Sequence, residues 1–120
     1  MDYRKKYGGH FKNAQVTGWL FFDNVEKKIV VKLIQTNLNK KDNQLLMEFF
    51  ENTYKHWDLS HFTTFKTIAV SFSFYMETLY KPNSNKKKAS AQNGFISEQI
   101  KIEFLTPPNR AFPKSITYSL

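Results

Sequence analysis

The chain has 120 residues, no cysteine, and 18 Lys and Arg against 10 Asp and Glu, which gives a formal charge of +8. This length supports one domain with one ordinary core, and the lack of cysteine excludes disulfides, thiolate nucleophiles and Cys-based zinc sites. The aromatic fraction of 17% is typical of a folded chain, and the excess positive charge would attract a polyanion.

Residues 1–13 are basic and contain a glycine pair, so we expect them to form a flexible arm. They lack the apolar run of a secretory signal, and no stretch of the chain approaches the length of a membrane span. We therefore expect a cytoplasmic protein without a membrane partner. The remaining chain divides into one domain over residues 14–106 and a C-terminal tail over residues 107–120.

Two strands are predicted at the start of this domain. The run from Val16 to Phe22 is β-branched and aromatic, and residues 28–36 alternate Ile29, Val31 and Leu33 with Val30, Lys32 and Ile34. The intervening Asp-Asn pair is typical of a turn. The pattern predicts a β-hairpin whose second strand is partly apolar on both faces.

A helix is predicted from Lys41 to Trp57, with Asn39 or Asp42 as its N-cap. Apolar and small side chains recur there at spacings of three and four, which is the period of a helix that packs one stripe onto a sheet. These positions are Leu45, Leu46, Phe49, Phe50, Thr53 and Trp57.

Two longer strands follow the helix. Residues 65–78 alternate cleanly between large apolar and small or polar side chains, and residues 95–105 repeat this alternation before Pro107 and Pro108. The motif Ser-Ile-Thr-Tyr in the tail favours a further edge strand. The expected fold is therefore α+β, an antiparallel sheet of four to five strands with one main helix in the order β-β-α-β-β. The alternative is an OB-like five-stranded barrel, for which residues 3–13 would have to supply a third strand before the helix.

A basic segment, residues 80–93, joins the two long strands. Its lysines Lys81, Lys86, Lys87 and Lys88 suit phosphate contact, and Tyr80 at its root offers a ring for base stacking. The other interpretation is a hairpin tip that lysines keep soluble.

The polar face of the first long strand is a second candidate surface. Small side chains there, at positions 69, 71 and 73, lie beside Tyr75 and leave room for a nucleic-acid strand, with Lys66 and Lys101 nearby. Such a stripe also fits another secondary-structure element or plain solvent.

Enzyme chemistry has little support in the sequence. His56, Asp58 and His61 have residue types that bind metals, but no regular spacing brings them together at the end of a helix. No phosphate-binding loop or nucleophile motif is present either. We expect a protein that is not an enzyme and that needs no cofactor and no metal.

The aromatic residues divide between the core and the candidate surface. The patterns assign Phe21, Phe22, Phe49, Phe50, Phe72, Phe74 and Phe104 to the core. Trp19, Tyr75, Tyr80, Phe95 and Tyr118 are left to stack on bases or to anchor a protein interface.

These patterns favour a small nucleic-acid-binding protein that prefers single strands, binding through lysines and a few stacking rings. The predicted contact residues are Arg4, Lys5, Lys6, Trp19, Lys66, Tyr75, Tyr80, Lys81, Lys86, Lys87, Lys88 and Lys101. The alternative is a protein-binding module, such as an inhibitor or accessory factor of a mobile genetic element, with a protein partner or a second copy of the chain bound through a strand edge.

Overall fold

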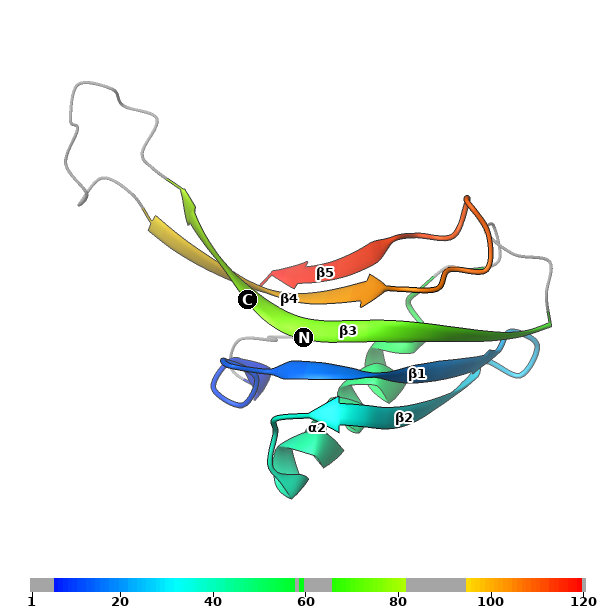
Figure 1. Ribbon diagram of the computed structural model, residues 1–120, viewed down its shortest axis with the longest axis horizontal. Coiled ribbons are helices and arrows are strands. Elements are labelled where there is room, and N and C mark those ends of the chain that lie inside the picture. Colours follow the sequence, from blue (N-terminus) through cyan, green and yellow to red (C-terminus); the bar gives the residue numbers. More distant parts are fainter. Residues whose placement is uncertain (1–5, 58, 60–65, 82–94, 120) are drawn as a thin grey trace.

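The structure is a computed structural model that describes residues 6–57, 59, 66–81 and 95–119, with the backbone alone at residues 80, 81 and 95–97. Five strands form one antiparallel sheet, and one long helix covers one of its faces (Figure 1). The elements are β1 (Gln15–Asp23), β2 (Lys28–Thr36), α2 (Lys40–Tyr54), β3 (Thr67–Lys81), β4 (Phe95–Phe104) and β5 (Ser115–Ser119). This arrangement confirms the predicted α+β class.

The sheet is open and has the strand order β2-β1-β3-β4-β5, so β2 and β5 are its edges. An OB-like fold curls its five strands into a barrel, whereas this sheet has two separate edge strands, so this alternative is not the fold of the described residues. The extra strand that a barrel would need before the helix is also missing from the described part of the N-terminal segment, where residues 6 and 7 are helical and turns follow.

The hydrophobic core lies between α2 and the facing side of the sheet. The alternation of the strands and the periodicity of the helix both place large side chains in this layer. The rings of Phe50 and Phe72 meet edge-to-face at 5.0 Å, and those of Phe49 and Phe74 at 5.9 Å. Such pairs add about 0.5–1.5 kcal/mol each beyond the burial of their area. Many of the aromatic residues of the chain are therefore structural parts of this layer.

Helix α2 begins as the sequence predicts. The side chain of Asn39 accepts a hydrogen bond from the Asp42 backbone N–H at 2.8 Å, which selects Asn39 as the N-cap. The helix ends at Tyr54, earlier than predicted, and two tight-turn hydrogen bonds follow, the second from the Trp57 N–H to the Tyr54 carbonyl at 2.9 Å. Trp57 is still buried, and its indole N–H donates to the Tyr118 hydroxyl.

The N-terminal segment packs against the domain. Tyr7 and Phe11 are fully buried, their rings stack at 5.4 Å, and Phe11 meets Phe74 edge-to-face at 5.2 Å. The Lys6 ammonium lies 3.2 Å from the Glu48 carboxylate on α2. Residues 6–13 thus belong to the packed structure, where the composition had suggested a flexible arm; residues 1–5 of that arm lie outside the described part of the chain.

The C-terminal segment also contributes to the fold. Phe112 is buried against Phe104 at a ring distance of 5.2 Å, and β5 pairs with β4 so that Ile116 lies opposite Ile102. The predicted edge strand is therefore present. The sheet and its core extend past residue 106, the end expected for the domain.

A β-bulge interrupts the pairing of β1 with β2. Thr17 pairs with Gln35 but Gly18 pairs with Leu33, which leaves Ile34 as the extra residue on β2. Only glycine fits at position 18, because a Cβ there would lie 2.2 Å from the Lys32 carbonyl oxygen and 3.0 Å from the Phe72 ring. The bulge therefore depends on a position that has no room for a side chain.

Strands β3 and β4 form a two-stranded ribbon that projects from the sheet (Figure 1). The pairing of β1 with β3 stops at Gln15 and Tyr75, and that of β5 with β4 stops at Gln99. Beyond these points, in the described part of the chain, β3 and β4 pair only with each other, and the last pair is Lys81 with Phe95. The predicted basic segment lies between the two strands of this ribbon in sequence, and its residues 82–93 lie outside the described chain.

Candidate nucleic-acid interface

The face of the sheet that looks away from α2 carries two exposed aromatic rings from β1. Trp19 is 37% exposed and Phe21 is 42% exposed, and their rings lie nearly parallel, 24° apart, with centroids at 6.4 Å. The assignment of Phe21 to the core is wrong, because Leu20 and Phe22 occupy the inward positions of β1. Alternation from Trp19 was the signal that could have placed Phe21 on the open face.

The neighbours of this ring pair leave it accessible. On the β3 side, Trp19 lies opposite Ser71, and Phe21 lies opposite Ala69, so the flanking side chains are short. On the β2 side, Trp19 lies opposite Lys32, and Phe21 opposite Val30. The predicted small-residue stripe on β3 does lie on the open face, where it borders the two rings.

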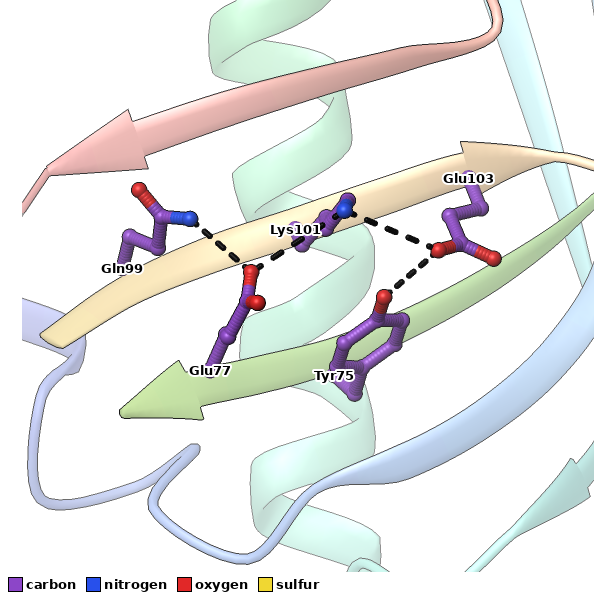
Figure 2. A network of polar contacts seen from close by, with 5 residues as sticks. All are labelled: Tyr75, Glu77, Gln99, Lys101 and Glu103. Carbon is purple, nitrogen blue, oxygen red and sulfur yellow. Dashed lines mark hydrogen bonds and ion pairs between the residues drawn. The ribbon is translucent and has the colours of Figure 1, made fainter. Parts of the chain in front are cut away.

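Tyr75 and Lys101, both predicted contact residues, lie in one polar network on this face (Figure 2). The Tyr75 hydroxyl donates to the Glu103 carboxylate at 2.6 Å, and the Gln99 amide donates to Glu77 at 2.9 Å. The Lys101 ammonium lies 3.8 Å from Glu103 and 4.0 Å from Glu77. Two carboxylates and one ammonium leave one net negative charge, so this part of the face does not attract phosphate.

The network also changes the acidity of Tyr75. The hydrogen bond to Glu103, with burial and the charges of Glu103 and Glu77 as further causes, raises the pKa of the Tyr75 hydroxyl to about 12. The hydroxyl therefore stays protonated at neutral pH and holds its hydrogen bond to the carboxylate. The position of the Tyr75 ring is fixed by this contact.

An open groove of about 660 Å³ lies where β1 begins and β3 continues past it. Polar side chains from three strands and the preceding turn line much of it, namely those of Lys12, Gln15, Thr17, Gln35, Ser73 and Tyr75. Asn37 fixes one rim, because its side chain donates to the Asn13 carbonyl at 2.6 Å and accepts from the Gln15 N–H at 2.8 Å. A second hollow, of about 460 Å³, lies beside Phe21 at the other end of β1.

The remaining predicted contact residues do not gather at one place. Lys6 is paired with α2, whereas Lys101 lies on the face that looks away from α2, so these two lysines do not form one site. Lys66 is exposed just before β3, and its charge helps to lower the pKa of Asp23 after the larger effect of the hydrogen bond from the Glu26 N–H. Arg4, Lys5, Lys86, Lys87, Lys88 and the side chains of Tyr80 and Lys81 lie outside the described residues.

Metal binding finds no support in the described part of the chain, which holds no group of three or more His, Cys, Asp or Glu side chains suited to an ion. His56 is exposed in the turn after α2, and Asp58 and His61 fall outside the described residues. In the ranges that the structure describes, no helix is long and apolar enough to cross a membrane.

Comparisons of the chain with protein-family models, with curated proteins and with solved structures find no match. The fold alone does not indicate a function, because one architecture can carry many activities. Function is therefore inferred from the side chains on the open face of the sheet.

Proposed function

We propose that the protein is a non-enzymatic binder of single-stranded nucleic acid that uses the open face of its sheet. The observation that carries this proposal is the exposed, nearly parallel pair of Trp19 and Phe21 beside Lys32. Unpaired bases stack on aromatic rings that a sheet presents to solvent, and a lysine next to the rings can contact the phosphates between those bases.

The expected energies are sufficient for useful affinity. Stacking on an aromatic side chain contributes about 1–3 kcal/mol per base, and two rings can hold two successive bases. Each phosphate that a lysine neutralises releases counterions and adds affinity that depends on salt. Double-stranded nucleic acid keeps its bases stacked on each other, so it would gain little from Trp19 and Phe21.

The carboxylates of the open face limit where the strand can lie. Glu77 and Glu103 lie on β3 and β4, and Lys101 neutralises one of their two charges. A phosphate backbone is therefore repelled from the β4 side. The favoured path crosses β1 and β2, where Lys32 lies opposite Trp19.

Further cations come from residues whose side chains the structure does not describe. Lys81 ends β3, and Lys86, Lys87 and Lys88 follow it in the sequence, while Arg4 and Lys5 precede the packed N-terminal segment. In this proposal they add electrostatic affinity without base specificity. Base contacts come from the sheet.

Fluorescence anisotropy with labelled oligonucleotides tests the proposal. The expected result is saturable binding of single strands, much weaker binding of the matching duplex, and a log–log salt slope of about −3.5 if about five phosphates are neutralised. No saturable binding at moderate salt, or a response that does not change with salt, would contradict it.

A second candidate function is binding of a protein partner, which includes a second copy of the chain. It is favoured by β2, an edge strand on which Val30 is 62% exposed and Ile34 is 58% exposed. Lys28 and Lys32 on the same strand oppose direct edge pairing, as lysines on edge strands commonly do. Light scattering after size exclusion distinguishes the candidates, because a dimer that persists at high salt and excludes oligonucleotides would favour this one.

A further inference from the structure

We infer that the groove at the start of β1 is a nucleobase subsite that favours adenine over the other bases. This inference rests on the proposed function, because it assigns one base of the bound single strand to this groove. The groove is the larger of the two hollows described on the open face, and it is lined by amide and hydroxyl groups rather than by a cluster of cations.

The groove continues the line of the aromatic pair. From Phe21 toward the start of β1, the outward side chains are Phe21, Trp19, Thr17 and Gln15, and the last two line the groove. Six residues of strand separate Phe21 from Gln15, which is about 20 Å. At about 3.4 Å for each stacked nucleotide, this distance accommodates up to about six nucleotides. A strand that stacks on the two rings and follows β1 therefore reaches the groove.

The β-bulge brings a second amide into this groove. In a regular strand Gln35 would share a face with Leu33, which lies opposite Gly18 on the side of the core. The extra residue Ile34 reverses this parity, so Gln35 pairs with Thr17 and lines the groove. Bulges often redirect a side chain at a functional site.

The walls of the groove are held in place by contacts within the protein. Asn37 bridges the backbone of Asn13 and Gln15. The Tyr75 ring is fixed by its hydroxyl, which donates to Glu103. A preorganised wall loses less conformational entropy when a ligand binds. A base can stack on the ring of Tyr75 while amides contact its edge.

The chemistry of the lining favours a base over a phosphate. Among the described residues that line the groove, Lys12 is the one with a charged side chain, whereas Gln15 and Gln35 each offer a donor and an acceptor side by side. An amide of this kind can form two hydrogen bonds with adenine, through the amino group and the adjacent ring nitrogen. Loss of such a pair reduces discrimination between bases by about tenfold.

The test compares anisotropy titrations of eight-nucleotide oligo-dA, oligo-dC and oligo-dT with the intact chain and with the double variant Gln15→Ala, Gln35→Ala. Both residues are exposed, so the double variant is expected to fold. The intact chain should bind oligo-dA about tenfold more tightly than the other two, and the double variant should lose most of this preference. Gln44→Ala, an exposed change on α2, is the matched control and should keep it.

The outcomes separate this inference from the proposed function. Binding of all three oligonucleotides with equal affinity, or a preference that the double variant retains, would overturn the base subsite and leave the single-strand proposal standing. No binding of any oligonucleotide would overturn both. As a second measurement, adenosine should shift the side-chain amide resonances of Gln15 and Gln35 in NMR spectra more than cytidine or thymidine does; unshifted resonances would also overturn the subsite.

Discussion

Trp19 of β1 lies directly opposite Lys32 of β2, and both side chains are exposed on the face of the sheet that α2 leaves uncovered. Cross-strand neighbours on one face lie about 5 Å apart at their Cβ atoms. A ring for a base and an ammonium for a phosphate are thus presented together by two adjacent strands. Substitutions of these two residues therefore test the proposed interface directly.

Replacement of the exposed indole should weaken binding. Trp19→Ala is expected to reduce the affinity for a single strand by about 1–3 kcal/mol, because one stacking platform is lost. Trp19→Phe retains a ring and should recover part of this loss. Val25→Ala removes an exposed apolar side chain in the turn between β1 and β2 and serves as the control in the same titration. Equal affinities for the alanine variants and the intact chain would contradict a stacking role.

Removal of the Lys32 charge should change how strongly the affinity for a single strand depends on salt. Lys32→Gln removes one phosphate contact, so the log–log salt slope should decrease in magnitude by about 0.7 while the order of preferred bases stays the same. Lys55→Gln, an exposed change after the end of α2, should leave the slope as it is. The measurement is a set of titrations at four or more salt concentrations. An unchanged slope in the Lys32 variant would show that Lys32 does not contact a bound phosphate.

Gly18→Ala should destabilise the fold. The new Cβ would lie 2.2 Å from the Lys32 carbonyl oxygen and 3.1 Å from the Leu33 Cα, so the backbone of β1 or of β2 must move. Overpacking of this kind costs about 1–3 kcal/mol or more. Urea unfolding should show a lower midpoint, whereas Gly9→Ala, where nothing lies within 4 Å, should change stability little. Equal midpoints for the two variants would contradict the described bulge.

Phe11→Ala tests whether the N-terminal segment is part of the core. The side chain is fully buried and contacts the rings of Tyr7, Phe49 and Phe74. Its truncation should lower the free energy of unfolding by about 3–5 kcal/mol, as for other buried phenylalanines. Lys12 is the exposed neighbour of Phe11, and Lys12→Ala serves as the control. Its free energy of unfolding should change by no more than about 0.5 kcal/mol. A mobile arm would instead give small effects for both variants in thermal or urea unfolding.

The polar network predicts a dependence of stability on high pH. The folded-state pKa of Tyr75 is raised to about 12 from its ordinary value near 10, chiefly by the hydrogen bond to Glu103. A raised pKa means that the stabilising contribution is complete below about pH 10 and is lost as the pH rises toward about 12. In Glu103→Gln, the Tyr75 pKa should fall toward 10, as a shifted tyrosinate absorbance titration would show. An identical titration in both proteins would contradict the contact.

Much of the fold could be predicted from local patterns in the sequence. Strand β3 alternates without exception from Ile68 to Met76, and α2 combines a helical apolar stripe with the cap Asn39, so both elements are predicted close to their observed bounds. The order of the elements then restricts the architecture to a few solutions. The choice between an open sheet and a barrel is not local, because it depends on which strands pair across long separations.

The candidate site was less predictable, because it depends on the register between strands and on which face each side chain occupies. The run from Val16 to Phe22 is apolar on both faces, so its composition hid the outward position of Phe21. The bulge at Ile34 depends on the close contact of Gly18 with the neighbouring strand, which no spacing within β2 reveals. Likewise, Lys101 is a plausible phosphate ligand in the sequence, and the register of β3 with β4 is what places carboxylates beside it.

The two tryptophans of the chain occupy opposite environments. Trp19 faces solvent on the open side of the sheet, whereas Trp57 is buried near the rings of Phe22, Phe50 and Phe104. Indole emission shifts to longer wavelength as its surroundings become more polar. The protein thus contains two intrinsic fluorophores that can be separated by wavelength, one for occupancy of the sheet face and one for the integrity of the core, and a single titration can report both without a label.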